Sequence, residues 1–584
     1  MKGLIRLLLS AGPVRTPLLG LVLLVKAGLA TGYMFAVGAL VSAIADGGPR
    51  DLVGPLVVLG ALMLAQDLAG PAQTMLAGDL TRAVTRKTTG TIVRAALTAG
   101  VARMENPEVA DHFSLAQGRA PGALPVGPAV GALAQLGATR LTGLAAALTL
   151  ASYAWWAPLP LAAAWMLTGR WVDREVRGAV AGFAASTASL RRATYFRNLG
   201  LLPAGAKELR VFGLGPWLVR RFAAAWAEGM REVLAFRQPR SAFAARLAVL
   251  AGAHVVTLSA LAVAGLDVGG LTVAVQAVFG TAALGYAGDP QWTLATAGSA
   301  LPHIEHVREL ATARPRGGGS ASGMPAREIR FEGAGFAYPG AGRNVLDGLD
   351  LTVPAGGSLA LVGGNGAGKT TLLKLLAGLY EPGQGRILID GTDLATIDPD
   401  SWRRQLAVVF QDFCRFEATL RDNVSFGAVH RPPDDDAVLD ALRLAGAGDL
   451  PGRLPYGLGT IMSRQYEGGG ELSGGQWQKV ALARAIYAVG HGARVLILDE
   501  PTAHLDVRAE SRLYERFLEL TSGVTTILVS HRFSTVRMAD RIAVLEGGRV
   551  AELGDHAGLV RAGGVYARSY ALHAGRFRRE AADA

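Results

Sequence analysis

Eight consecutive residues near the middle of the chain have the types and spacing of a phosphate-binding loop. The loop follows an apolar stretch, 358–362, precedes another that begins at Thr371, and reads Gly363-Gly364-Asn365-Gly366-Ala367-Gly368-Lys369-Thr370. In the order strand, glycine loop, helix, backbone N–H groups can close around phosphates at a helix N-terminus. Lys369 would place a positive charge on the β- and γ-phosphates, and Thr370 would offer a hydroxyl to Mg²⁺. We therefore expect residues 363–371 to bind a nucleotide.

Two acidic residues follow another apolar run later in the chain. Asp499 and Glu500 come directly after Val495-Leu496-Ile497-Leu498. A buried strand at this position would deliver Asp499 to Mg²⁺, and Glu500 would then stand where a general base can polarise a water molecule. A glutamate at this position could also be a mere surface charge. The combination with the glycine loop predicts hydrolysis of the bound nucleotide.

The chain as a whole is too apolar for an ordinary soluble enzyme. Of the 584 residues, 50% are hydrophobic and only 18% are charged. Apolar runs that approach or exceed the roughly 20 residues needed to cross a bilayer predict membrane helices. We count six spans, at about 17–45, 52–78, 126–152, 157–168 with an extension into the following segment, 243–266 and 270–300.

Arginine and lysine are concentrated in the two long connections, after the second and the fourth span. By the positive-inside rule these connections are cytoplasmic, and so are both termini and the nucleotide site. The net charge of +11 is thereby accounted for without a nucleic-acid partner. The only cysteine, Cys414, excludes an internal disulfide bond. A Gly- and Arg-rich tract predicts a flexible linker at 312–325, between a transmembrane domain, 1–311, and a nucleotide-binding domain, 326–584.

A third motif, Leu472-Ser473-Gly474-Gly475-Gln476, lies between the glycine loop and Asp499. Together the three motifs resemble those of ABC-type ATPases, and the six preceding spans make the chain similar to an exporter-type ABC transporter half-molecule. This resemblance implies a six-helix bundle of the type IV exporter fold, followed by an α/β P-loop ATPase domain. It also implies that ATP is the nucleotide, that Mg²⁺ is its metal, and that hydrolysis drives transport.

The resemblance assigns further residues to the site. Tyr338 would stack on adenine, Gln411 would touch Mg²⁺ or the attacking water, and His531 would contact the γ-phosphate. Asp506 ends the segment Pro501-Thr502-Ala503-His504-Leu505-Asp506, which looks like the D-loop. In this family the helix N-terminus at Ser473, Gly474, Gly475 and Gln476 caps the ATP held by another copy. A homodimer with two sites is therefore expected, although a heterodimer is possible.

Two cytoplasmic segments resemble the coupling helices through which such transporters link their domains. They are Glu105-Asn106-Pro107-Glu108-Val109-Ala110-Asp111-His112-Phe113 and Lys207-Glu208-Leu209-Arg210-Val211-Phe212-Gly213-Leu214. Charged periodic segments of this kind are also common as plain amphipathic surface helices. We favour the coupling role.

Ionisable residues inside the predicted spans need an explanation, because each costs roughly 2.5–3.5 kcal/mol at the bilayer centre. Lys26, Asp67 and Asp289 are predicted to lie within about 5 Å of one depth, at about 1.5 Å per residue. They could form a polar cluster along the cargo path. Alternatively, Lys26 and Asp67 could be a structural pair that never meets cargo.

The transported molecule is not encoded in any motif. Apolar spans fit an amphipathic small molecule, a lipid or a peptide, exported across a bacterial inner or plasma membrane, with membrane lipid around the spans. An importer of a siderophore or another nutrient and a nucleotide-gated channel or regulator are the alternatives. The six spans exclude a soluble nucleic-acid ATPase.

Overall fold

The computed structural model describes residues 2–46, 52–119, 123–185, 187–235, 242–285, 288–312, 317–500, 523–530 and 532–572. The chain divides into two compact units. Unit 1 comprises 1–99 and 106–313, and unit 2 comprises 100–105 and 314–584. Each unit is described separately.

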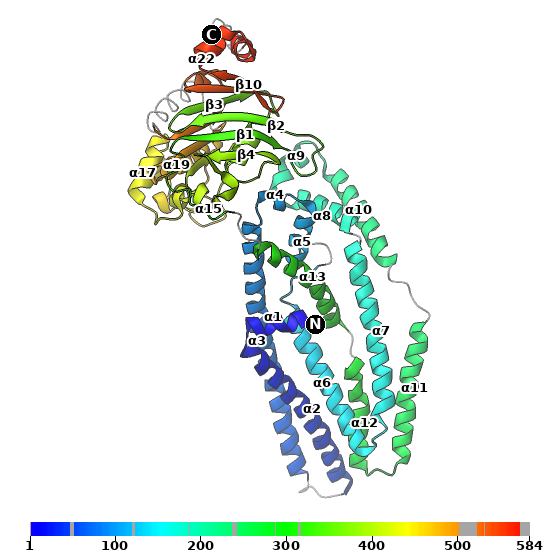
Figure 1. The fold of residues 1–584 in the computed structure, drawn as a ribbon. Coiled ribbons are helices and arrows are strands. Elements are labelled where there is room, and N and C mark those ends of the chain that lie inside the picture. Colours follow the sequence, from blue (N-terminus) through cyan, green and yellow to red (C-terminus); the bar gives the residue numbers. More distant parts are fainter. Residues whose placement is uncertain are drawn as a thin grey trace. The chain divides into compact units, whose positions relative to one another are not determined.

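Unit 1 is helical (Figure 1). Its long helices occur where the apolar runs of the sequence predict them, because a helix satisfies its own backbone hydrogen bonds. The α-helices are α1 (Lys2–Ala11), α2 (Arg15–Asp46), α3 (Val53–Thr98), α5 (Pro107–Ala116), α6 (Ala129–Tyr153), α7 (Pro158–Ala185), α8 (Thr187–Leu201), α9 (Ala206–Val211), α10 (Gly215–Ala235), α11 (Ala242–Val263), α12 (Val268–Gly280) and α13 (Asp289–Thr312).

Four helical stretches among the described residues are long and apolar enough to cross a membrane: 15–45, 53–98, 244–263 and 268–310. They correspond to the first, second, fifth and sixth predicted spans. The third and fourth predicted spans form the long helices α6 and α7, which are not among these four. The helical layout expected from the sequence is confirmed.

The sixth predicted span is not one continuous helix, which corrects the sequence-based prediction. Helix α12 ends at Gly280, a 3₁₀-helix follows at Thr281–Gly285, and α13 begins only at Asp289. The interruption lies beside α6: a Cβ at Gly143 of α6 would stand 2.7 Å from the backbone nitrogen of Leu284. The length of the apolar run does not reveal the break, although the residues after it are less apolar and begin with Gly288-Asp289-Pro290.

Helices α2 and α12 pack closely through small residues. A Cβ at Gly38 would lie 2.4 Å from Cγ2 of Val273 and 3.0 Å from the carbonyl oxygen of Gly269. Small residues at such a crossing let two helix backbones approach, which is how helices associate where water does not drive them together. Helix α2 also packs against α3 along its length. These contacts hold α3, α2 and α12 as neighbours.

Unit 2 contains two β-sheets. The four-stranded antiparallel sheet has the order β2-β1-β4-β5, with β1 (Glu328–Phe336), β2 (Leu346–Pro354), β4 (Gln384–Ile389) and β5 (Thr392–Asp393). The six-stranded sheet has the order β10-β9-β3-β8-β7-β6, with β3 (Ser358–Gly363), β6 (Leu406–Val409), β7 (Val495–Asp499), β8 (Thr525–Val529), β9 (Arg541–Glu546) and β10 (Arg549–Gly554). Strands β6, β7, β8, β3 and β9 are parallel, whereas β10 is antiparallel to β9.

One helix of unit 2, α4, comes from the segment 100–105, which lies between the two parts of unit 1 in the sequence. The α-helices of the unit are α4 (Val101–Met104), α14 (Lys369–Leu376), α15 (Pro399–Arg403), α16 (Leu420–Ser425), α17 (Asp435–Leu444), α18 (Leu450–Arg453), α19 (Gly474–Gly490), α21 (Phe533–Val536) and α22 (His556–Ala562). One buried core packs α16, α17 and α19 together, and another joins α14 to both sheets. This is the P-loop α/β architecture predicted from the sequence (Figure 1).

Part of the segment predicted as a flexible linker makes defined contacts within unit 2. The backbone nitrogen of Gly319 donates to the carbonyl oxygen of Thr396 at 3.2 Å, and that of Ala321 donates to Oγ of Ser401 at 2.8 Å. The Ala321 side chain is fully buried. Residues 319 and 321, within the predicted linker 312–325, therefore pack against unit 2.

Candidate active site

The glycine loop leaves the carboxyl end of β3, an inner strand of the six-stranded sheet, and runs into α14. Gly368 is the N-cap of α14 and has φ +99°. A Cβ there would lie 2.6 Å from Cδ2 of Leu346. Only glycine meets both demands, because L-residues rarely adopt such a φ. The N-terminus of α14 is thereby open to an anion.

Two backbone carbonyls of the glycine loop hold the side chain of Lys369 in place. Its side chain is only 7% exposed, and Nζ donates to the carbonyl oxygens of Gly363 at 2.7 Å and Gly364 at 2.9 Å. Burial lowers the pKa of Lys369, and the carboxylates of Glu500 and Asp499 oppose that shift. A buried ammonium hydrogen-bonded to neutral carbonyls is well suited to pair with a phosphate.

Thr370 and Asp499 form the pair of oxygen donors expected at a magnesium site. The Thr370 hydroxyl donates to Oδ2 of Asp499 at 2.9 Å, and Asp499 is 1% exposed at the end of β7. Burial raises the pKa of Asp499, whereas the hydrogen bond from Thr370 opposes the rise. Hydroxyl and carboxylate oxygens are hard ligands of the kind Mg²⁺ prefers. The two side chains fit the metal implied by the sequence.

The order of the parallel strands brings Gln411 and Glu500 together at the edge of the sheet that holds the glycine loop. Strands β6 and β7 are neighbours, so Gln411, after β6, meets Glu500, after β7. Nε2 of Gln411 lies 3.5 Å from Oε2 of Glu500. Glu500 has φ +48°, and its backbone nitrogen donates to Val529 of β8 at 3.0 Å. A non-glycine residue held at positive φ is strained, and such strain is concentrated at functional sites.

Two predicted site residues fall outside the described part of the chain. These are His531 and Asp506, the latter within the D-loop-like segment 501–506. Their predicted roles remain predictions. The residue before His531, Ser530, accepts from the backbone nitrogen of Arg532 at 3.0 Å.

Ser473 is the N-cap of α19, and the Ser473-Gly474-Gly475-Gln476 segment forms a capping box. Oγ of Ser473 accepts from the backbone nitrogen of Gln476 at 3.3 Å, and Oε1 of Gln476 accepts from that of Ser473 at 2.8 Å. A capped N-terminus carries the positive end of the helix dipole. Leu472 and Trp477, on either side, belong to the core of α16, α17 and α19, not to the core around α14.

Tyr338, predicted to stack on adenine, lies beside α14. Its hydroxyl is 3.1 Å from Oγ1 of Thr371, and its ring packs edge-on against Tyr380, with centroids 5.5 Å apart. Nζ of Lys374 lies 5.6 Å from the Tyr338 ring centroid. The ring is half-buried, and stacking on a base would cover the remaining surface.

Tyr380 is a residue that sequence reasoning missed. Its hydroxyl donates to Oε2 of Glu105 at 2.6 Å, and Glu105 is the C-cap of α4. Burial raises the pKa of Tyr380, and the bond to Glu105 raises it further, so the phenol remains a donor. No spacing rule links residues 275 positions apart. Of the first coupling-like segment, 105–113, residues 107–113 lie in α5, which Asn106 caps, and Glu105 is the C-cap of α4.

We predict that Tyr380→Phe loosens the segment 100–105 from the rest of unit 2. A hydrogen bond to a carboxylate contributes about 1.5–3 kcal/mol, so local opening should increase roughly 10- to 100-fold. Hydrogen exchange of the Met104 and Glu105 amides measures this opening. Tyr456→Phe, in an exposed tyrosine of the same unit, is the matched control. Unchanged exchange in Tyr380→Phe would show that the contact contributes nothing.

Part of unit 2 matches a known protein family. Residues 346–503 match the family described as ABC transporter. This range includes the glycine loop, Gln411, the Ser473 segment and the Asp499-Glu500 pair, but not Tyr338, Asp506 or His531.

Three curated relatives illustrate the similarity. The chain is 35% identical over 242 residues to the subtilin transport ATP-binding protein of Bacillus subtilis, which is 41% of this chain and 39% of the relative. It is 40% identical over 270 residues to an ATP-dependent lipid A-core flippase of Burkholderia orbicola, 46% and 44% of the two chains. It is 36% identical over 275 residues to a cyclolysin secretion/processing ATP-binding protein of Bordetella pertussis, 47% and 37%. The matches thus span less than half of these relatives.

One solved structure matches nearly the whole chain. It is that of a bacterial Atm1-family ABC exporter with ATP bound, with a TM-score of 0.71 and 23% identity, covering 97% of this chain and 99% of the other. At this identity the likeness establishes the fold of both units.

Proposed function

We propose that this chain, which joins an ABC transporter ATPase domain to a helical domain of the Atm1-family exporter fold, is one half of an ATP-driven exporter. The observation that carries the proposal is the placement of Glu500 beside Asp499, at the edge that also holds the glycine loop. A domain that only bound ATP would not need a strained glutamate there. Hydrolysis in the same chain as four helical stretches that, among the described residues, are long and apolar enough to cross a membrane points to coupled transport.

The residues of unit 2 divide the reaction between them. The loop amides and Lys369 bind the β- and γ-phosphates, and Tyr338 and Thr371 lie on the adenine side. Thr370, Asp499 and Gln411 would hold Mg²⁺, which supplies charge neutralisation on the phosphate oxygens. Glu500 polarises the water for in-line attack on the γ-phosphate, Gln411 orients that water, and His531 contacts the γ-phosphate.

The complete site needs a second chain. The N-terminus of α19 offers a second anion-binding end, but its flanking residues belong to a different core from that around the loop. We therefore assign Ser473, Gly474, Gly475 and Gln476 to the γ-phosphate of ATP held by a partner, and Asp506 to the interface between the two. A second copy is the simplest partner, because each chain carries one loop and one capping helix.

Cargo transport is expected to be ATP-dependent and directed away from the ATPase. Amphipathic small molecules, lipids and peptides can be screened for stimulation of hydrolysis by the purified protein in bacterial lipid. Those that stimulate should accumulate several-fold above background in inside-out inner-membrane vesicles. Vesicles containing Glu500→Gln supply the background. ATP-dependent loss of a preloaded compound from such vesicles would instead establish import.

A further inference from the structure

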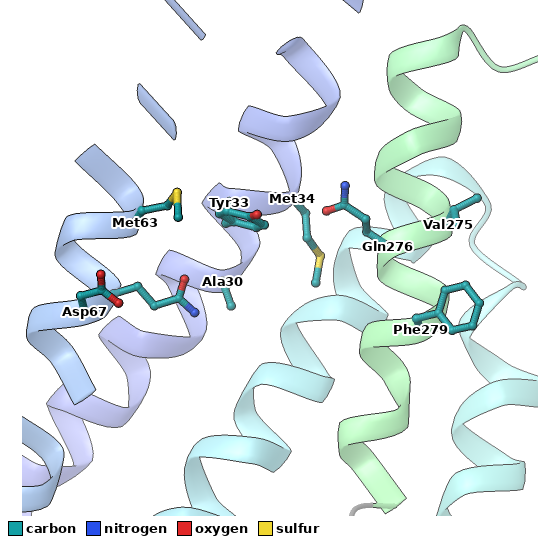
Figure 2. Close-up of a pocket in the computed structure, with 9 residues that line it drawn as sticks. Ala30, Tyr33, Met34, Met63, Asp67, Val275, Gln276 and Phe279 are labelled. Atoms are coloured by element: carbon teal, nitrogen blue, oxygen red, sulfur yellow. The ribbon is translucent and has the colours of Figure 1, made fainter. Parts of the chain in front are cut away.

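A cavity of about 570 Å³ opens between α2, α3 and α12 in unit 1. Its polar lining comes from Tyr33, Gln66, Asp67 and Gln276, and its apolar lining includes Met34 and Phe279. Figure 2 shows these helices side by side, with Asp67 at the α3 side and Phe279 at the α12 side. The volume is typical of sites that hold drug-sized ligands.

Asp67 is the one acidic residue in this lining. It is exposed, and it makes no hydrogen bond or ion pair with any residue that the structure describes. It lies 67 − 53 = 14 residues from the start of α3, which is roughly 21 Å at 1.5 Å per residue. That depth falls inside a hydrocarbon layer about 30 Å thick. An uncompensated carboxylate is costly there, so it marks a functional site.

Neither alternative predicted for Asp67 from the sequence describes the structure. Nζ of Lys26 donates to Oε1 of Gln73 at 2.9 Å, so no Lys26–Asp67 pair forms. Asp289 is the first residue of α13 and does not line the cavity. Of Lys26, Asp67 and Asp289, only Asp67 lines the cavity, where it can contact a ligand.

The groups around Asp67 select the chemistry of that ligand. The Tyr33 ring of α2 also lines the cavity and can face a cation held by Asp67. The thioether of Met34 adapts to irregular apolar shapes. Gln66 and Gln276 offer neutral hydrogen-bonding groups. A negative carboxylate beside apolar walls favours a cation attached to an apolar body and disfavours an anionic headgroup.

We propose that this cavity binds the cationic group of an amphipathic cargo, with Asp67 as its counter-ion. The proposal rests on the proposed function and narrows its cargo class to amphipathic cations.

Binding without ATP tests the proposal on the full-length protein in lipid nanodiscs. Rhodamine 6G, an amphipathic fluorescent cation, should show saturable binding by fluorescence anisotropy. Tetraphenylphosphonium should compete with it, whereas the near-isosteric anion tetraphenylborate should not. Asp67→Asn should weaken rhodamine binding at least about tenfold, because it removes the charge and keeps the shape. Asp67→Glu should restore most of the affinity.

Asp79→Asn is the matched control. Asp79 also lies on α3, but it pairs with Arg82 and lies outside the cavity, so rhodamine affinity and basal hydrolysis should both be unchanged. Thermal unfolding establishes that each variant is folded. Equal competition by the anion, no saturable binding of the cation, or full affinity in Asp67→Asn would each overturn the proposal. Because binding is measured without ATP, the binding assay tests the cation site separately from export. A failure of export in vesicles would therefore not be mistaken for a failure of cation binding.

Discussion

Glu500→Gln is expected to lower ATP turnover by at least about 100-fold, the usual contribution of a general base, while ATP still binds. The amide keeps the size of the carboxylate, and Lys369, Thr370 and Asp499 keep their contacts with phosphate and metal. Only the group that polarises water is lost. Closed dimers holding ATP should therefore accumulate.

Phosphate release measures turnover, and binding of a fluorescent ATP analogue measures affinity. Glu546→Gln is the matched control, because Glu546 also ends a parallel strand of the same sheet but lies on β9, away from Asp499. It should hydrolyse ATP normally. Turnover within a few-fold of wild type in Glu500→Gln would mean that another group is the base.

Lys369→Ala should instead weaken ATP binding itself. Its buried ammonium is the positive charge that the loop holds by the carbonyls of Gly363 and Gly364. A charge-assisted bond to phosphate contributes about 1.5–3 kcal/mol, so affinity should fall roughly 10- to 100-fold. Equilibrium binding to the purified variant measures the loss. Undiminished affinity would exclude the phosphate role of Lys369.

Mixing two inactive variants tests whether each ATP site is shared between two chains. Ser473→Arg places a bulky cation at the capping helix and should also abolish hydrolysis. In a mixed dimer, the loop of the Ser473→Arg chain faces the intact helix of the Lys369→Ala chain. Random mixing should recover up to about a quarter of wild-type activity, since half the dimers are mixed and each has one of two sites. No recovery in demonstrably mixed dimers would contradict independent shared sites.

The sequence alone determined the class of the molecule and the local parts of its ATP site. A strand, a glycine loop and a helix are contiguous in 358–376, so their order can be predicted from adjacent residues, whereas the contact with Leu346 that requires glycine at Gly368 comes from the tertiary structure. Apolar run lengths likewise predicted the long helices. Because these features depend on neighbours along the chain, periodicity and spacing suffice to identify them.

The tertiary structure alone decided which distant residues meet. Strand order placed Gln411 beside Glu500, and packing joined Tyr380 to Glu105. Helical depth suggested a cluster of Lys26, Asp67 and Asp289 or, alternatively, a Lys26–Asp67 pair, but depth does not specify which way each side chain faces around its helix. In the structure, Lys26 of α2 donates a hydrogen bond to Gln73 of α3, whereas Asp67 lines a cavity. Long-range pairing follows from how helices and strands pack, and no local pattern encodes that.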